Sequence, residues 1–215
     1  MAGIPAEGSI PQIADEFIIQ QWRKYKNHSL NYIIGVENKM AEDIIAVDKF
    51  DKEIGPIEKM EAHHEGVLHR AFSILIFNSQ NQLLLQKRDE KKYHSPGLWT
   101  NTCCSHPRYG EELQDAAYRR LKEEMGFTCE LNEVFSFVYK VEFEDNLFEN
   151  EYDHVFIGIY DGEVVANKDE VEDFKWVDMN EVKADILDKP QLYTYWFKYL
   201  FDRAEKELYK HIKQK

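Results

Sequence analysis

Two short apolar segments, residues 70–77 and 82–86, limit the fold more than any other feature of this sequence. Each has the length of one β-strand, and only the polar residues NSQN lie between them. That spacing predicts a β-hairpin. The run at 72–77 is far shorter than the ~20 apolar residues that a membrane helix needs. The segments therefore predict a β-sheet in a globular domain.

Other segments alternate between strand-like and helix-like patterns. Further strands are expected at 44–47, 134–143, 152–160 and 174–177. Helices are expected at 111–125, where Gly126 ends the helix, and at 180–187 and 191–212. The simplest architecture is a mixed β-sheet with helices packed on it, an α/β (α+β) fold. A length of 215 residues suits one domain with extensions, and an amphipathic stretch at 17–25 lies in the first of these.

Charge is unevenly distributed along the chain. There are 27 Lys and Arg residues against 40 Asp and Glu, a net charge of −13. This disfavours non-specific nucleic-acid binding, which needs many phosphate-neutralising cations. Residues 85–108 nevertheless carry a net charge of +3, and residues 109–183 carry −14. The basic segment suits a local anion site and the acidic segment suits metal ions, although both also fit an ordinary solvated surface.

The cysteines and the chain ends favour a cytoplasmic location. Three cysteines, two of them adjacent, make a poor disulfide framework, and no CxxC pair suggests a zinc ribbon. The first residues lack the pattern of a signal peptide, and the final KQK is not a peroxisomal signal. Membrane and secreted proteins are therefore disfavoured classes.

The predicted helix 111–125 has an apolar side whose residues recur at helical spacing: Leu113, Ala116, Ala117 and Leu121. At 100° per residue, Arg120 and Glu124 lie within about 20° of Leu113, on this inward face. Because burying an unpaired carboxylate is costly, Glu124 should meet a cation, a metal ion or a cleft. Alternatively, the last turn projects past the core, or Glu124 pairs only with Arg120.

Acidic residues alternate with other residues just before an apolar segment. In a strand, Glu149, Glu151 and Asp153 would share one face with the apolar residues Val155, Ile157 and Ile159. Carboxylates this close on a face that becomes apolar suggest a metal site or an acid/base pair. If the strand instead begins at Val155, the acids lie in a solvated loop.

A cysteine and several histidines add further ligand types. In the extended segment TNTCCSHP, Cys104 and His106 would project to the same side, and a thiol can act as a ligand, an acid or a nucleophile. A lone cysteine is also often a small buried hydrophobe. Residues 61–70 contain three more histidines. The residue types together indicate a metal-dependent enzyme acting on a phosphorylated small molecule.

Three sequence blocks resemble type 1 isopentenyl-diphosphate isomerase, a family with the Nudix fold: HRAFS at 69–73, PGLWTNTCCSHP at 96–107 and ENE at 149–151. The resemblance covers residues 44–197. It implies a Nudix-like mixed β-sheet sandwiched between helices, with an extension at 1–43 and a C-terminal helix at 198–215. The helix segment also resembles the Nudix box, but Ser105 replaces its first glycine and Arg120 replaces a glutamate. Losing one metal-collecting acid disfavours the alternative activity, a Nudix pyrophosphohydrolase.

The resemblance implies roles for individual residues. Cys104 and Glu151 match the catalytic cysteine and glutamate, and Tyr139 and Trp196 match aromatics that line the alkene pocket. Glu124 matches a residue that holds Mg²⁺ on the substrate diphosphate. The remaining matches are the ligands of a second divalent ion and the phosphate-facing cations: His63, His69, His106, Glu149 and Glu151 for the ion, and Lys59, Arg88, Lys92 and Arg120 for the phosphates. The context AHxxGxLH favours His63 over His64 as the first ligand.

The implied reaction moves a double bond of isopentenyl diphosphate by one carbon and yields dimethylallyl diphosphate, a step of isoprenoid biosynthesis. One proton is added to the terminal alkene carbon and another is removed from C2, which requires an acid, a base and a pocket without water. The implied cofactors are Mg²⁺ with the diphosphate and Mn²⁺, Mg²⁺ or Zn²⁺ in the His/Glu site. The expected partner is this small molecule alone, bound by a monomer or a homodimer. A non-catalytic metal- or nucleotide-binding module would leave Cys104 and the two glutamates without a role.

Overall fold

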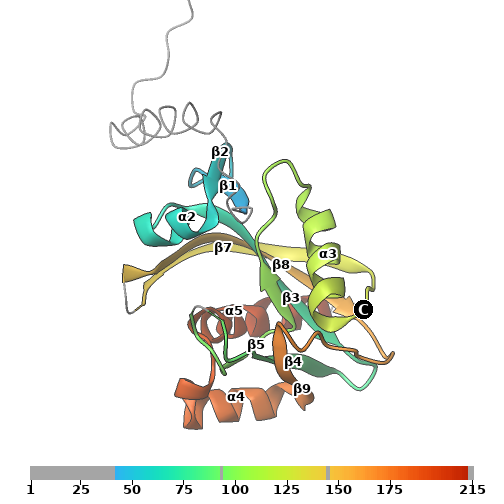
Figure 1. The fold of residues 1–215 in the computed structure, drawn as a ribbon. Coiled ribbons are helices and arrows are strands. Elements are labelled where there is room, and N and C mark those ends of the chain that lie inside the picture. The colour runs from blue at the N-terminus through green and yellow to red at the C-terminus, as the bar shows by residue number, and fades with distance from the viewer. Residues whose placement is uncertain (1–41, 93, 144–145, 213–215) are drawn as a thin grey trace, which may run out of the picture. The chain divides into compact units, whose positions relative to one another are not determined.

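Strand β3 (His69–Phe77) is the central strand of the sheet (Figure 1). It pairs in parallel with β8 (Phe148–Ile159), which pairs antiparallel with β7 (Leu131–Glu142). Because both kinds of pairing occur, the sheet is mixed, as the sequence predicted. This computed structural model describes three ranges of residues: 42–92, 94–143 and 146–212. The amphipathic stretch expected at 17–25 lies outside them.

The other edge of β3 is shared by several strands. β1 (Asp43–Val47) pairs with the start of β3, β6 (Cys103–Ser105) with its middle and β4 (Gln82–Arg88) with its end. The predicted hairpin is confirmed, and the Asn78 side chain stabilises its turn by accepting hydrogen bonds from two backbone amides. Three more strands extend the sheet: β2 (Glu53–Glu58) beside β1, and β5 (Trp99–Thr100) and β9 (Val171–Asp178) beside β4.

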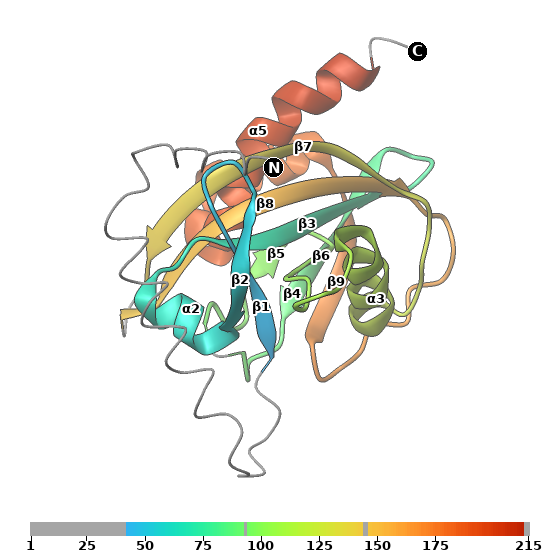
Figure 2. The same ribbon diagram turned by 90° about the horizontal axis from the view of Figure 1, so that it is seen from above.

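Helices cover both faces of the sheet, and each face has its own apolar core (Figures 1 and 2). On one face, α3 (Leu113–Met125) packs its predicted apolar side against β3 and β8. On the other face, α5 (Tyr195–Ile212) packs against β3, β7 and β8. α4 (Met179–Asp188) lies beside β9, and α2 (Lys59–Glu65) follows β2 directly. The prediction of a mixed sheet sandwiched between helices is confirmed, and none of the described helices has the length and apolar character that a bilayer crossing requires.

Helix α3 begins two residues later than predicted. Glu111 stays outside the helix because its carboxylate accepts hydrogen bonds from the Arg108 amide and the Arg119 guanidinium. The predicted end is confirmed: Gly126 adopts a left-handed φ of 80° and its amide bonds to the Lys122 carbonyl. A Cβ at this position would lie 2.3 Å from the Val165 carbonyl oxygen, so only glycine fits without movement.

The predicted helix 191–212 is divided in two. A 3₁₀ turn, η3 (Pro190–Leu192), comes first, and α5 begins only after Thr194. The Thr194 hydroxyl accepts a hydrogen bond from the Phe197 amide, which is the geometry of a helix N-cap. The sequence placed a boundary between residues 197 and 198, where the Nudix-like domain was expected to end and a C-terminal helix to begin. This boundary falls inside α5, and the helix has buried residues both before and after it.

Strand β8 begins at Phe148, so the alternative that it starts at Val155 is wrong. Glu149, Glu151 and Asp153 are buried on the face that also carries Val155, as predicted. Ile159, which the alternation places on the same face, is 70% exposed at the end of the strand and is not part of the apolar core.

Neither β2 nor α2 was predicted. Gly55 and Pro56 interrupt the alternating pattern of β2, and α2 has only seven residues, too few to display a helical period. The N-terminus of α2 is stabilised by the Glu58 carboxylate, which accepts a hydrogen bond from the Glu61 amide. This short helix carries two of the predicted site residues.

Candidate active site and metal centre

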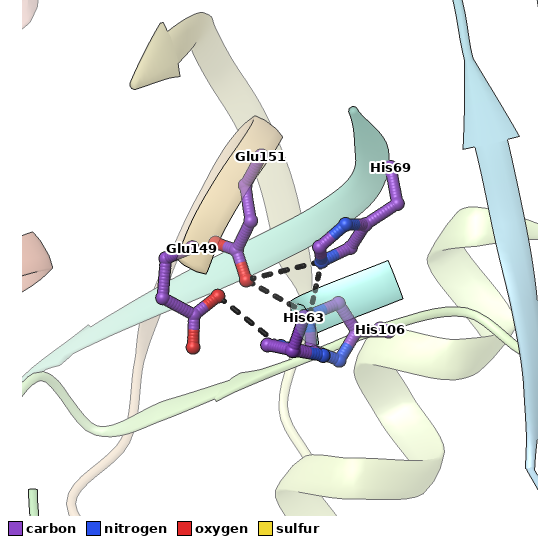
Figure 3. Close-up of side chains that lie close together, drawn as sticks. All are labelled: His63, His69, His106, Glu149 and Glu151. Atoms are coloured by element: carbon purple, nitrogen blue, oxygen red, sulfur yellow. Dashed lines mark hydrogen bonds and ion pairs between the residues drawn. The ribbon is translucent and has the colours of Figure 1, made fainter. Parts of the chain in front are cut away.

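Five buried side chains converge on one point at the start of β3 and β8 (Figure 3). His69 and Glu151 are neighbours in the β3–β8 register, and Glu149 lies two residues earlier on the same face of β8. α2 contributes His63, and the segment after β6 contributes His106. One ligand atom from each of the five lies within 4.8 Å of all the others. His64 is exposed and lies outside this cluster.

The contacts within the cluster join imidazole nitrogens to carboxylate oxygens and, in one case, to another imidazole nitrogen (Figure 3). His106 Nε2 lies 2.8 Å from Glu151 Oε1 and 3.2 Å from His69 Nε2. His63 Nε2 lies 3.3 Å from Glu149 Oε2. Imidazole nitrogens and carboxylate oxygens gathered this closely could serve as the ligands of a divalent transition-metal ion or Mg²⁺.

The backbone orients two of these histidines. His63 Nδ1 donates to the Lys59 carbonyl at 2.6 Å, and His69 Nδ1 donates to the Val67 carbonyl at 2.8 Å. In a neutral imidazole, a proton on Nδ1 leaves the Nε2 lone pair directed at the cluster. Metal-ligating histidines in proteins are usually held in this way. The buried Glu149 Oε2 accepts no hydrogen bond from the described residues, so the site also contains an oxygen for which a cation would be the natural partner.

The protonation states suit a cation of charge +2. Burial lowers the pKa of His106 to about 4 despite the opposing Glu151 carboxylate, so this imidazole is neutral at physiological pH. Burial by itself would raise the pKa of Glu149, but the neighbouring His63 and His94 hold it well below its usual range. Burial and Glu149 likewise raise the pKa of Glu151, and His106 and His69 outweigh them and lower it. Two ionised carboxylates therefore lie beside the neutral imidazole of His106, and one divalent ion would balance their charge.

A cavity beside the cluster gathers the other predicted residues. Cys104 and Tyr139 line it from β6 and β7, and the Tyr139 hydroxyl donates to Glu151 Oε2 at 2.6 Å. Phe72, His94 and Ser105 also line the cavity, although the sequence analysis assigned them no role there. The remaining lining residues were all predicted and include four cations and an indole: Lys59, Arg88, Lys92, His106, Arg120, Glu124, Glu149, Glu151 and Trp196.

Glu124 and Arg120 of α3 are both on the inward face, and they also pair with each other. Arg120 Nη2 donates to Glu124 Oε1 at 2.5 Å, and Gln86 Nε2 donates to Glu124 Oε2 at 2.9 Å. Glu124 is 4% exposed, so its buried charge has both a cation and a neutral donor. The sequence allowed two alternatives: Glu124 points inward toward a cation, a metal ion or a cleft, or it only pairs with Arg120. In the structure Glu124 points inward and also pairs with Arg120.

Each of the four cations has a partner within the protein. Lys92 forms an ion pair with Glu170, and Arg120 Nη2 lies 3.5 Å from the same carboxylate. Lys59 Nζ lies 3.9 Å from Glu42. Arg88 donates to backbone carbonyls of the loop between β4 and β5, and its guanidinium lies 5.1 Å from the centre of the Trp196 ring. Because all four line the same cavity, they suit a multiply charged anion.

Cys104 holds its proton tightly. Burial raises the pKa of its thiol to about 12, despite the opposing charge of Arg88. We expect iodoacetamide to alkylate Cys104 roughly a thousandfold more slowly at pH 8 than an ordinary thiol, since only the thiolate reacts. The rate should rise about tenfold per pH unit up to pH 10, measured by peptide mass spectrometry. A fast rate that levels off near pH 8 would show that Cys104 is a thiolate.

The chain resembles known proteins along most of its length. A model of the NUDIX domain family matches residues 67–197. Isopentenyl-diphosphate Delta-isomerase 1 of Aromatoleum aromaticum is 54% identical over 165 residues, which cover 77% of this chain and 93% of that protein. Isopentenyl-diphosphate Delta-isomerase 2 of Photorhabdus laumondii is 55% identical over 159 residues, 74% of this chain and 90% of that protein. The crystal structure of DR0079 from Deinococcus radiodurans superposes with a TM-score of 0.64 at 19% identity, covering 75% of this chain and 98% of that one, and so supports the fold alone.

Proposed function

The chain belongs to the isopentenyl-diphosphate Delta-isomerase family of the Nudix fold, and we propose that Cys104 and Glu151 carry the two proton transfers of its reaction. The protein converts isopentenyl diphosphate into dimethylallyl diphosphate, as an intramolecular oxidoreductase that transposes a C=C bond. The observation that carries the proposal is that a thiol and a carboxylate line one cavity that also contains cations for a diphosphate.

The reaction needs one proton delivered and one removed. Protonation of the terminal alkene carbon gives a tertiary carbocation, and loss of a proton from C2 then gives the new double bond, so that the composition is unchanged. Cys104 and Glu151 are the proton-transfer groups, and Tyr139 orients Glu151 through its hydroxyl. The faces of Tyr139 and Trp196 stabilise positive charge on the hydrocarbon by cation–π attraction, and α5 keeps water away from it.

Two divalent ions complete the site in this proposal. His63, His69, His106, Glu149 and Glu151 would hold one of them, which would be Mn²⁺, Mg²⁺ or Zn²⁺. Glu124, which lines the cavity, would help to hold Mg²⁺ with the substrate diphosphate. When bound, the first ion supplies positive charge that tunes the acidity of Glu151. The protein residues hold the carboxylates and imidazoles in place and provide the neutral nitrogen lone pairs.

The diphosphate serves as a handle for the short hydrocarbon. Lys59, Arg88, Lys92 and Arg120 bind it, and its binding energy orients the alkene between Cys104 and Glu151. Arg120 also accounts for the absence of hydrolysis in this proposal. It stands where a Nudix pyrophosphohydrolase carries a metal-collecting glutamate, and it pairs with Glu123 and Glu124 at 2.8 and 2.5 Å.

The cellular setting is proposed to be the cytoplasm. Cys103, Cys104 and Cys129 are free thiols, which suits a reducing compartment.

The test is an incubation of the purified protein with isopentenyl diphosphate and Mg²⁺ in D₂O, followed by proton NMR. We expect dimethylallyl diphosphate that carries deuterium in a methyl group, because the added proton comes from a group that exchanges with solvent. Release of phosphate or pyrophosphate without isomerisation would overturn the proposal and favour a pyrophosphohydrolase.

A further inference from the structure

The carboxylate of Glu149 has a contact on the side that faces away from the proposed ion. Its Oε1 lies 2.9 Å from His94 Nε2, whereas its Oε2 lies 3.3 Å from His63 Nε2. An ionised carboxylate can only accept hydrogen bonds, so His94 donates through Nε2–H. One oxygen of Glu149 is therefore held by His94, and the other is left directed at the cluster.

Three other members of the cluster are held from outside in a similar way. The Lys59 carbonyl orients His63, the Val67 carbonyl orients His69, and the Tyr139 hydroxyl orients Glu151. Outer partners of this kind fix the direction of a metal ligand and tune its basicity. His94 has the same relation to Glu149 that Tyr139 has to Glu151.

His94 is itself held firmly by aromatic packing. Only 10% of its side chain is exposed. Its ring stacks on Phe143 with centroids 5.7 Å apart and planes 12° apart, and the Trp196 ring meets it edge-on at 5.5 Å. The imidazole therefore has little freedom to leave Glu149.

The backbone of His94 is fixed as well. It belongs to the loop between β4 and β5, where Arg88 Nη2 donates to the His94 carbonyl at 3.1 Å and Arg88 Nε donates to the Ser95 carbonyl at 3.2 Å. The turn at Gly97 has a left-handed φ of 66°, and its amide donates to the Arg88 carbonyl at 3.1 Å. The guanidinium of Arg88 donates hydrogen bonds to this loop and its carbonyl accepts one from it, and together these bonds shape the loop.

We propose that His94 is a positioning residue for the divalent-ion site, which it serves by donating a hydrogen bond to Glu149 Oε1 and directing Oε2 at the ion. The inference rests on the metal role proposed for Glu149. His94 does not contact the ion, and its contribution is to the affinity of the site. Its ring also forms part of the cavity wall between Phe143 and Trp196.

The test compares His94→Phe with His94→Gln in protein stripped of metal by a chelator. Phenylalanine keeps the ring packing but removes the donor, whereas glutamine keeps a donor. We expect His94→Phe to weaken Mn²⁺ binding roughly ten- to a hundredfold, as loss of an outer partner typically does. His94→Gln should bind close to the wild type. The readout is the dissociation constant from electron paramagnetic resonance of unbound Mn²⁺, and most of kcat should return to His94→Phe at saturating Mn²⁺.

Two further variants separate the failure of this inference from failure of the proposed function. His64→Gln changes an exposed histidine of the same helix as His63 and should leave Mn²⁺ binding unchanged. Glu149→Gln should abolish tight binding. If Glu149→Gln loses the ion while His94→Phe keeps wild-type affinity, the role of His94 is wrong and the ion site stands. Equal losses in His94→Phe and His94→Gln would also overturn it, and unchanged binding in Glu149→Gln would overturn the ion site itself.

Discussion

Replacing Cys104 by alanine is expected to lower kcat roughly 10²–10⁴-fold, the range that one general acid or base contributes. The thiol lines the cavity, and its pKa is raised to about 12 by burial, so it holds a proton that the reaction can use. Alanine cannot transfer a proton and leaves the cations for the diphosphate in place. KM for isopentenyl diphosphate should therefore change little, and initial rates followed by NMR or by a radiochemical assay measure both constants.

Cys129 provides a matched control for this experiment. It is a half-buried free thiol that lies outside the cavity, beside Gly158. Cys129→Ala should keep wild-type kcat and KM, and thermal unfolding followed by circular dichroism should show that both variants are folded. Full activity in Cys104→Ala would remove the thiol from the mechanism and would leave Glu151 and Tyr139 as the groups to test next.

Removal of divalent ions is expected to abolish isomerisation and to lower the melting temperature. Without a cation, the partners of the buried carboxylates of Glu149 and Glu151 are histidines and the Tyr139 hydroxyl, and Glu149 Oε2 accepts no hydrogen bond from the described residues. An ion at one hundred times its dissociation constant stabilises the native state by about 2.7 kcal/mol. For a chain of this size that corresponds to a rise in melting temperature of about 5–10 °C. Scanning calorimetry with EDTA and then with excess Mn²⁺, Mg²⁺ or Zn²⁺ measures the shift and ranks the ions.

The affinity for the ion should also fall as the pH is lowered. Burial lowers the pKa of His63, but the neighbouring Glu149 carboxylate outweighs it and raises the pKa above its ordinary value. His63 therefore gains a proton as the pH falls through neutrality, and that proton competes with the ion. The pKa values of Glu149 and Glu151 are lowered, so these ligands stay ionised until the solution is much more acidic. Affinity that is constant between pH 8 and pH 6 would contradict the role of His63 as a ligand.

Local patterns in the sequence predicted the parts of the site that lie on long regular elements. The alternation along β8 placed Glu149 and Glu151 on one face, and the helical period of α3 turned Arg120 and Glu124 inward. These predictions worked because the apolar residues of each element show which side is buried. The TNTCCSHP block likewise drew attention to Cys104 before any contact was known.

Other parts of the site could not be obtained from local patterns. α2 is too short to show a period, yet it brings His63 to Glu149. His94 lies in a loop whose shape depends on hydrogen bonds from Arg88, so no spacing in the sequence pointed to it. Gln86 was seen only as a strand residue, although its amide donates to Glu124.

By itself, the sequence determined the mixed sheet, its hairpin, the principal helices and the chemical types of side chain available, because these depend on residues near one another in the chain. Only the tertiary structure decided which side chains meet. His106 reaches His69 and Glu151 across 37 and 45 residues of sequence, and these contacts exist because β6 pairs with β3 and β3 pairs with β8, each in one particular register. A shift of that register by one residue would turn Glu149 and Glu151 to the opposite face of the sheet, away from the histidines. The ion site therefore depends on long-range strand pairing, which the pattern of any single segment does not specify.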